Sequence, residues 1–255
     1  MKQKHALILA FLITGLLASN LYLFSIMNKT ELEFAVIGRV IDADTIVLED
    51  GRTLRLLNIN APEKSSSLSS SPLRYMKQYE NQTIKIQITE LDKYQRSLAR
   101  IYDLNNNYLN LELVAEGLAS TFLVSPEELN EFKKAEEKAI EEGKGIWKHS
   151  EYWDCLISEI DKEDEFVTLT NLCNNINLNS WELKDESRKT FKFPNININK
   201  GQNIILYSTE DQNDIENEEI TLYWQQKTNV WNNDRDTLYI FDSSNNIVHF
   251  NSYGY

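Results

Sequence analysis

Positive charge is scarce in this sequence. The 255 residues include 26 Lys and Arg against 39 Asp and Glu, which gives a formal net charge of −13 at pH 7. Broad, sequence-independent binding to a phosphate backbone relies on clustered Lys and Arg, and this composition argues against it. The shortage is greatest in residues 150–255, which hold 8 basic and 19 acidic residues. A nucleic-acid role would therefore have to rest on a local site.

Cysteine is almost absent. The first cysteine, Cys155, begins the stretch CLISEID, and the second, Cys173, ends the stretch EFVTLTNLC. The pattern of these stretches predicts two strands joined by the acidic turn KEDE. If the strands pair antiparallel about that turn, position 155 falls opposite about position 172, within bridging range. We predict a Cys155–Cys173 disulfide, which an exported protein permits; two unpaired buried thiols are the alternative.

Charge is also absent from residues 6–27, ALILAFLITGLLASNLYLFSIM. About 20 apolar residues match the hydrocarbon thickness of a bilayer. Two lysines before the segment, against Lys29, Glu31 and Glu33 after it, favour an N-terminus inside the cell. The rival interpretation is a cleaved signal peptide with LLAS as its cleavage site. We expect a retained single-pass anchor at the cell membrane, or secretion if the segment is cleaved; either way the folded part is exported.

The rest of the composition is ordinary for a globular protein, and the length suffices for two domains with their own cores. Residues 34–101 contain short strand patterns separated by polar turns, with DG at 50–51 as a hairpin signal. Helical spacing follows in LNLELVAEGLA and in SPEELNEFKKAEEKAIEEGKGIW. Five short strands with inserted and appended helices predict a mixed fold, an OB-type β-barrel with helices over residues 31–149.

Local signals mark the ends of these helices. Ser125 and Glu128 form a capping box with Pro126 at the first helical position, and Gly143 ends the run. The serine-rich stretch SSSLSSS (65–71) is typical of a low-complexity loop.

After Trp147 the character of the chain changes. Residues 155–255 are strand patterns and Asn/Asp-rich turns at sandwich-like intervals, which predict an all-β immunoglobulin-like sandwich over residues 153–255. Residues 1–30 form the third segment, the anchor or signal. We expect Trp181 and Trp231 to be core residues, and no titratable cluster with catalytic spacing occurs in this second domain.

Charged and amide side chains of the first domain gather near its predicted strand ends. Two carboxylates in DADT (42–45) would point the same way from an extended chain. RLLNINAPE and DKYQR supply the others, so that the set is Asp42, Asp44, Arg55, Asn60, Glu63 and Arg96.

In this order and spacing the motifs resemble the staphylococcal-nuclease (thermonuclease-like) family. The family's Asp-Gly-Asp-Thr stands at 42–45, its Arg-Leu-Leu…Asp-x-Pro-Glu at 55–63 and its Asp-x-Tyr-x-Arg at 92–96. The helix ending in GIW is also similar, so the resemblance covers residues 34–149. It implies a metal-dependent phosphodiesterase, an endonuclease that hydrolyses DNA or RNA with calcium.

The resemblance also implies a role for each site residue. Arg55 and Arg96 would clamp the non-bridging phosphate oxygens, which suits their planar, bidentate geometry. Glu63 would orient or deprotonate the attacking water. Asp44 would hold Ca²⁺, with the Ala61 carbonyl as a neutral ligand.

Two positions depart from the family pattern. Asn60 stands in place of an aspartate ligand; its amide oxygen can still bind metal, but one negative charge leaves the site. Extracellular calcium sites work at about 10⁻⁴–10⁻³ M, a range an exported enzyme tolerates. Ala43 replaces a glycine, which requires a backbone without positive φ.

The second domain resembles a lamin-tail domain, on the stretches EFVTLTN, LNSWELKDE, FKFPNININKGQNIILYS and VWNNDRDTLYIFDSSNNIV. By resemblance it would bind a partner, nucleic acid or envelope component. Its negative charge favours a protein or cell-surface partner over direct nucleic-acid binding.

These observations leave two readings. The first is an exported, membrane-anchored, calcium-dependent nuclease with a C-terminal interaction domain. The alternative is a non-catalytic module that keeps the nuclease fold and binds nucleic acid or protein. Asn60 favours the non-catalytic alternative, whereas the presence of Arg55, Glu63 and Arg96 favours the enzyme.

Overall fold

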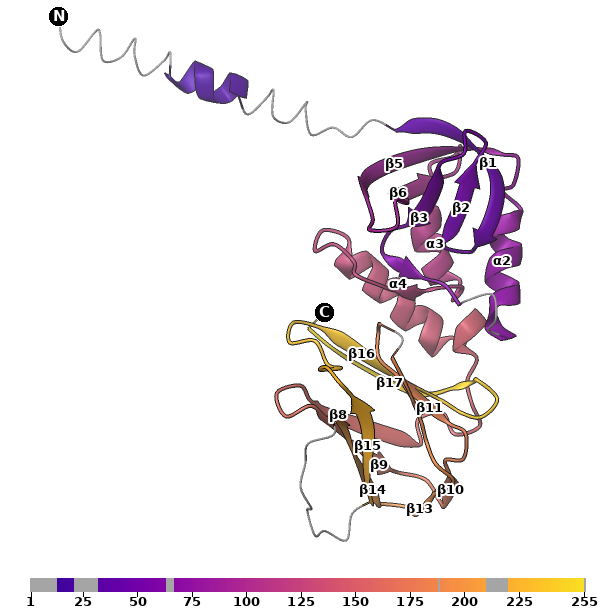
Figure 1. Cartoon of the computed structure of the whole chain (residues 1–255), viewed down its shortest axis with the longest axis vertical. Helices are drawn as coiled ribbons and strands as arrows, with labels where there is room; N and C mark the ends of the chain where they lie inside the picture. Colours follow the sequence, from indigo (N-terminus) through magenta and orange to yellow (C-terminus); the bar gives the residue numbers. More distant parts are fainter. Residues whose placement is uncertain (1–12, 21–31, 63–66, 188, 210–219, 255) are drawn as a thin grey trace, which may run out of the picture.

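The computed structural model describes residues 13–20, 32–62, 67–187, 189–209 and 220–254. Figure 1 shows a barrel toward the N-terminal side, a sandwich of strands at the C-terminal end, and helices between them. The predicted fold class, an OB-type barrel with helices followed by an immunoglobulin-like sandwich, is confirmed.

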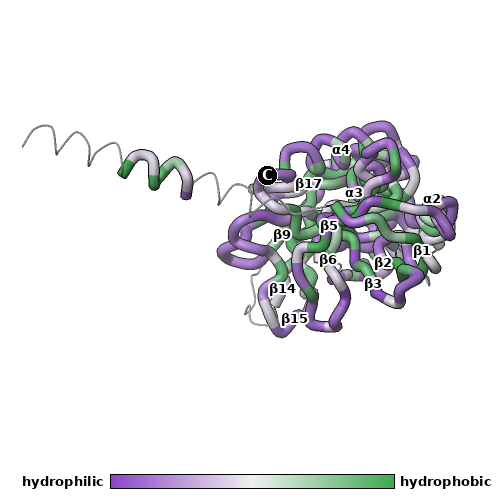
Figure 2. The backbone as a smooth tube through the Cα atoms, turned by 90° about the horizontal axis from the view of Figure 1, so that it is seen from above, coloured by the Kyte–Doolittle hydropathy of each residue, from purple (hydrophilic) through white to green (hydrophobic). Residues whose placement is uncertain are grey.

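The first domain is built on a closed barrel of five strands. They are β1 (Glu33–Asp42), β2 (Thr45–Leu48), β3 (Thr53–Leu56), β5 (Thr83–Leu91) and β6 (Ser97–Tyr102). The barrel closes in the order β1-β2-β3-β6-β5, with β3 and β6 parallel. Along β6 every second residue is buried, because alternate side chains of a strand point to opposite faces. In Figure 2 hydrophobic residues colour much of the strands, and hydrophilic residues colour many of the outer turns.

Helices and a short second sheet complete this domain. They are η1 (Ser67–Ser69), α2 (Ser70–Lys77), α3 (Leu109–Ala115), α4 (Leu129–Glu141), η2 (Gly145–Trp147) and the pair β4 (Ile59–Asn60) and β7 (Ser120–Thr121). Fully buried Met76, Leu113 and Phe132 join the helices to the barrel core. Gly143 follows α4 with a φ of 63°, the left-handed conformation expected of a glycine that ends a helix.

The predicted capping box is wrong. α4 begins at Leu129, its N-cap residue is Glu128, and no side chain caps it. The Glu128 carboxylate accepts hydrogen bonds from Arg100 (2.5 Å), Asn58 (2.8 Å) and the Ser125 hydroxyl (3.2 Å), and none of these is a bond to a backbone N–H of the helix. Desolvation raises the pKa of Glu128, but the hydrogen bonds from Arg100 and Asn58 outweigh it and hold the pKa below its ordinary value. A tertiary ion pair has taken the side chain that local sequence assigned to the helix end.

The prediction of a loop over the serine-rich stretch 65–71 is wrong for residues 67–71, which are helical. Residues 63–66 lie outside the described residues, but Ser67–Ser69 form η1 and α2 begins at Ser70. Pro72 is buried in the first turn of α2, where its missing N–H is not needed by the helix.

The second domain packs two four-stranded sheets face to face. One contains β12 (Thr190–Lys192), β11 (Glu182–Lys184), β16 (Asp236–Phe241) and β17 (Ile247–Tyr253) in that order. The other contains β15 (Ile220–Gln226), β14 (Asn203–Thr209), β9 (Phe166–Asn171) and β8 (Leu156–Asp161), and a small pair joins β10 (Ile176–Asn177) to β13 (Asn197–Ile198). Trp181 and Trp231 are buried in the core between them, as predicted.

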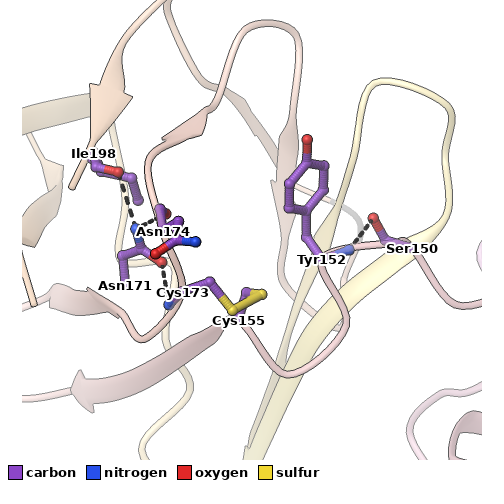
Figure 3. Close-up of a disulfide and its surroundings, with 7 residues drawn as sticks. All are labelled: Ser150, Tyr152, Cys155, Asn171, Cys173, Asn174 and Ile198. Carbon is purple, nitrogen blue, oxygen red and sulfur yellow. Dashed lines mark hydrogen bonds between the residues drawn. A yellow bond between two sulfur atoms is a disulfide. The ribbon is translucent and has the colours of Figure 1, made fainter. Parts of the chain in front are cut away.

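The Cys155–Cys173 disulfide is present, as predicted (Figure 3). β8 and β9 pair antiparallel with Leu156 opposite Asn171, and the Leu172 N–H donates to the Cys155 carbonyl. The Asn171 side chain accepts the Cys173 N–H at 2.9 Å and donates to the Ile198 carbonyl, which fixes the chain beyond the bridge.

The two domains share a third apolar core. Trp147 of η2 stacks on Tyr239 and Phe241 of β16, with ring centroids 5.1 and 6.4 Å apart. Only 2% of Trp147 is exposed, and Ile140 of α4 packs beside it against Ile247. Buried aromatic rings of this size fix the placement of the domains relative to each other.

Most of the predicted anchor 6–27 lies outside the described residues. Its described part, residues 13–20, is helical with exposed Ile13, Leu16 and Leu17. Among the described residues, no helix is both long and apolar enough to cross a membrane.

Removal of the disulfide is expected to destabilise the second domain. The bridge closes a loop with a sequence separation of 18. Loop-closure entropy of that size corresponds to about 3 kcal/mol of unfolding free energy. We expect a Cys155→Ser, Cys173→Ser double variant to lose about that amount in a urea titration followed by tryptophan fluorescence. An equal loss in the wild type upon full reduction is the control, and unlinked thiols in mass spectrometry without reductant would contradict the assignment.

Candidate active site

Asp44 lies in the turn that joins β1 to β2. Asp42 pairs with Thr45, so Ala43 and Asp44 are the two turn residues, not strand residues as the DADT pattern suggested. Ala43 is not among the described residues with positive φ, so alanine fits where the related pattern has glycine. Only 7% of Asp44 is exposed, and the Thr45 hydroxyl donates to its Oδ1 at 2.9 Å.

Arg55 brings three of the predicted residues together. β2 and β3 pair with Thr45 opposite Arg55, which places the guanidinium beside the turn. Its Nη2 lies 3.4 Å from Asp44 Oδ2 and donates to Asn60 Oδ1 at 3.2 Å, while Nη1 donates to the Leu56 carbonyl at 2.6 Å. Asp44 Oδ2 and Asn60 Oδ1 therefore both face the Nη2 nitrogen of Arg55.

Ala61 completes this cluster through its backbone. Its N–H donates to Asp44 Oδ2 at 2.8 Å, so the chain after β4 lies against the β1–β2 turn. β4 is itself held by β7, where Asn60 pairs with Ser120. Asp44, Arg55, Asn60 and Ala61 thus form one contact cluster.

Arg96 approaches from the parallel strand β6. Arg55 pairs with Leu98, so barrel closure brings Arg96, the residue just before β6, onto the neighbouring strand two residues from the level of Arg55. Asp92 binds the Arg96 Nε at 2.8 Å and its Nη2 at 2.7 Å. Desolvation raises the pKa of Asp92, but the hydrogen bonds from the Arg96 backbone and side chain outweigh it and hold the pKa below its ordinary value.

Both arginines line one cavity of about 560 Å³. Its other walls include Tyr94, Phe122 and Leu123. Tyr94 is 68% exposed, and the Arg96 guanidinium lies 5.4 Å from the centre of its ring. Two guanidinium groups beside an exposed ring can bind a phosphate and stack a base.

Glu63, the predicted residue that would act on the attacking water, lies outside the described residues. Its predicted role in orienting or deprotonating water stays a prediction.

The metal-binding prediction rests on oxygen donors alone. In the described part of the chain, no three His, Cys, Asp or Glu residues lie close enough to hold an ion. Asp44, Asn60 and Ala61 offer a carboxylate, an amide oxygen and a carbonyl, which is the donor type that calcium takes. Asp44 Oδ2 and Asn60 Oδ1 both lie against the Arg55 Nη2 nitrogen, so calcium binding by these donors stays a prediction.

Comparison with known proteins agrees with this geometry. The model of the "Staphylococcal nuclease homologue" family matches residues 53–149, and that of the "Lamin Tail Domain" family matches residues 149–255. The chain joins a nuclease domain of the staphylococcal type to a lamin tail domain. "Endonuclease YhcR" of Bacillus subtilis (strain 168) is 29% identical over 139 residues, which is 46% of this chain. The match spans 11% of that relative's own length.

The nuclease domain extends beyond the residues matched by the family model. Asp44 precedes position 53, yet β1 and β2 belong to the closed barrel and carry the turn that holds it. The barrel therefore needs both the matched and the preceding strands to form the site.

Sequence reasoning missed part of the site. It assigned no role to Phe122 and Leu123, which wall the cavity of the nuclease domain. It also missed a second cavity, of about 210 Å³, where Asn60 and Ala61 face Asp185 and Glu186 of the lamin tail domain. Neither set has a motif, because its members come from separate elements and meet only after folding.

An Asn60→Asp substitution is expected to strengthen calcium binding. It places a second carboxylate beside Asp44, and Arg55 already donates a hydrogen bond to the position of the new oxygen. Since ligand charge sets calcium affinity, we expect the dissociation constant to fall by about tenfold or more. Isothermal titration of the full chain with CaCl₂ measures this without any substrate.

Asn199→Asp adds the same charge in the lamin tail domain and is the matched control. Equal affinities for wild type and Asn60→Asp would show that position 60 is not a ligand.

Proposed function

We propose that this chain is an exported, membrane-anchored nuclease that hydrolyses phosphodiester bonds of DNA or RNA with calcium. The observation that carries the proposal is that Arg55 and Arg96 line one cavity, while Arg55 also contacts Asp44 and Asn60. The nuclease domain and the relative named as an endonuclease support the same reaction.

The two arginines would act as a preorganised clamp on the phosphate. Leu56, Asn60 and Asp44 hold the Arg55 guanidinium, and Asp92 holds that of Arg96. Charge develops on the non-bridging oxygens in the transition state, and donors fixed beforehand stabilise it without reorganisation. Arginine suits this role because its planar donors match a phosphate bidentately.

The remaining roles fall to the acidic and amide residues. Asp44, Asn60 and the Ala61 carbonyl would hold Ca²⁺, which when bound supplies positive charge to the phosphate. Glu63 would orient the attacking water or take its proton. The wall residue Tyr94 would stack a base beside the phosphate.

Location and partners form the second part of the proposal. Residues 6–27 would anchor the chain in the membrane with both domains outside the cytoplasm, or be cleaved to release it. The lamin tail domain, with 8 basic and 19 acidic residues in 150–255, would hold a protein or envelope component, not a polyanion.

A non-catalytic module is the second candidate, and Asn60 is the observation that favours it. An amide at this position lowers the charge available to the metal, and Arg55 already neutralises Asp44. Such a protein would bind nucleic acid or protein without cutting it.

Cleavage of single-stranded DNA by the full chain tests the enzyme. We expect cleavage in millimolar calcium that a chelator abolishes. Arg96→Ala and Glu63→Gln should each lower the rate by about 100-fold or more, because each removes a group that acts on the transition state. Arg96 is preferred to Arg55, whose loss would leave the buried Asp44 carboxylate without its ion pair.

Arg52→Ala is the matched control, since Arg52 binds Glu33 and Asp50 at the opposite end of the β2–β3 hairpin. If the wild type and both site variants leave the DNA intact across a wide calcium range, the result contradicts the enzyme and supports the non-catalytic binding module.

Membrane fractionation tests the anchor. We expect the full chain to stay in the membrane pellet after alkaline extraction and to be digested by protease added to intact cells. A chain in which Leu16 and Leu17 are both changed to Lys should be soluble, because charge at the centre of a span is costly. Recovery of the wild type in the cytoplasmic fraction would contradict export.

A further inference from the structure

One wall of the nuclease cavity has a strained backbone. Phe122 and Leu123 border the cavity that contains Arg55 and Arg96. Leu123 is 69% exposed and has a φ of 49°, a left-handed conformation that bulky side chains rarely adopt. Such a conformation persists only where the surroundings hold it.

The lamin tail domain supplies contacts that hold this turn. The Arg235 Nη2 donates to the Val124 carbonyl at 2.6 Å, and Glu186 Oε1 accepts the Leu123 N–H at 3.4 Å. From within the nuclease domain, the Phe122 N–H donates to the Asn58 carbonyl at 2.9 Å. The strained residue is therefore fixed on both sides, and the second domain provides two of these three hydrogen bonds.

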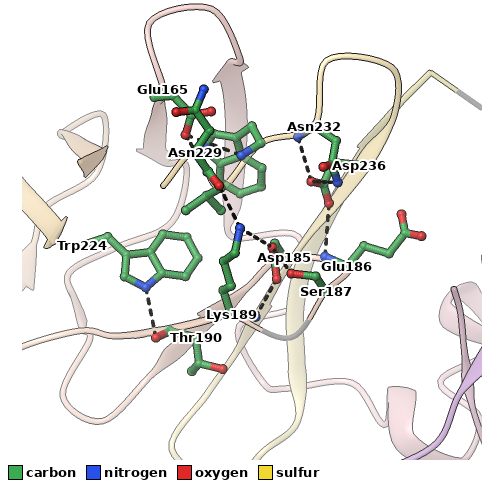
Figure 4. A network of polar contacts seen from close by, with 12 residues as sticks. Glu165, Asp185, Glu186, Ser187, Lys189, Thr190, Trp224, Asn229, Asn232 and Asp236 are labelled. Carbon is green, nitrogen blue, oxygen red and sulfur yellow. Dashed lines mark hydrogen bonds and ion pairs between the residues drawn. The ribbon is translucent and has the colours of Figure 1, made fainter. Parts of the chain in front are cut away.

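Glu186 lies beside a network of polar contacts in the lamin tail domain (Figure 4). The buried Asp236 accepts the Glu186 N–H at 3.1 Å and the Asn232 N–H at 3.1 Å. Asp185 accepts the Ser187 hydroxyl at 2.6 Å in the same loop. Figure 4 shows the Glu186 side chain extending away from this network, and Arg235 immediately precedes Asp236 in the chain.

A third link reaches the strand before the turn. Glu136 of α4 is 1% exposed, and its carboxylate accepts the Thr121 N–H at 2.7 Å and the Thr121 hydroxyl at 2.8 Å. The Tyr239 hydroxyl of β16 donates to the same carboxylate at 3.3 Å. Thr121 lies in β7, which pairs with the strand that carries Asn60.

We propose that the lamin tail domain positions the substrate-binding wall of the nuclease domain, with Arg235 as the main positioning residue and Glu186 and Tyr239 as its supports. This rests on the proposed nuclease function for its substrate, but the ordering of the turn can be measured without cleavage. In this proposal Arg235 acts through the Val124 carbonyl and the adjacent Leu123.

Arg235→Met in the full chain tests the proposal, because methionine keeps the apolar stem and removes the donors. Loss of a charged hydrogen bond corresponds to about a tenfold effect. We expect KM for single-stranded DNA in millimolar calcium to rise about tenfold with kcat within about twofold, because Arg55 and Arg96 stay in place. Amide exchange at 121–124 should accelerate by a similar factor, and Arg235→Lys should restore part of both values.

Lys192→Met is the charge-matched control, since it removes one cation from an exposed strand of the same domain. An unchanged KM and unchanged exchange in Arg235→Met, or equal changes in Lys192→Met, would overturn the proposal. If Arg235→Met does not fold, Tyr239→Phe decides by the same two measurements, with smaller expected changes. A wild type that does not cleave refutes the proposed function alone, and the exchange measurement still tests the positioning of the turn.

Discussion

The buried guanidinium of Arg55 is the interaction on which the site depends. It lies between the Asp44 carboxylate, the Asn60 amide oxygen and the Leu56 carbonyl, and its side chain is only 13% exposed. A charge in this position is costly unless its partners are in place, so the β1–β2 turn, the end of β3 and β4 must form together. The same cost explains why a site residue can also be a residue that stabilises the barrel.

Barrel closure gives the site its second arginine. β6 joins β3 in parallel, with Leu98 opposite Arg55, and this pairing brings Arg96 to the neighbouring strand two residues from the level of Arg55. Asp92 then fixes the guanidinium by two contacts, so the two clamps come from segments about 40 residues apart in sequence but adjacent in the sheet. The positive charge that the composition lacks is thus concentrated where a phosphate would bind.

The two domains form a fixed pair. Trp147 stacks on Tyr239 and Phe241, and the acidic lamin tail domain lies against the helices and the turn that border the nuclease cavity. Any ligand that enters the cavity meets the acidic neighbour as well as the arginines. The second domain is therefore part of the environment of the site and not only an appended module.

How much of the structure can be predicted from the sequence depends on how far apart in the chain the interacting residues lie. The barrel strands, the sandwich strands, the disulfide and the end of α4 at Gly143 follow from alternation, register and backbone conformation, which neighbouring residues set. The start of α4 does not, because the Glu128 carboxylate pairs with Arg100 and does not cap the helix. The left-handed Leu123, the contacts of Arg235 and Glu186 and the cavity walls at Phe122 also depend on packing between separate elements. Local residue order determined the elements and named the chemical groups, whereas only the tertiary structure decided which of those groups meet, since burial and ion pairing are settled between segments far apart in the chain.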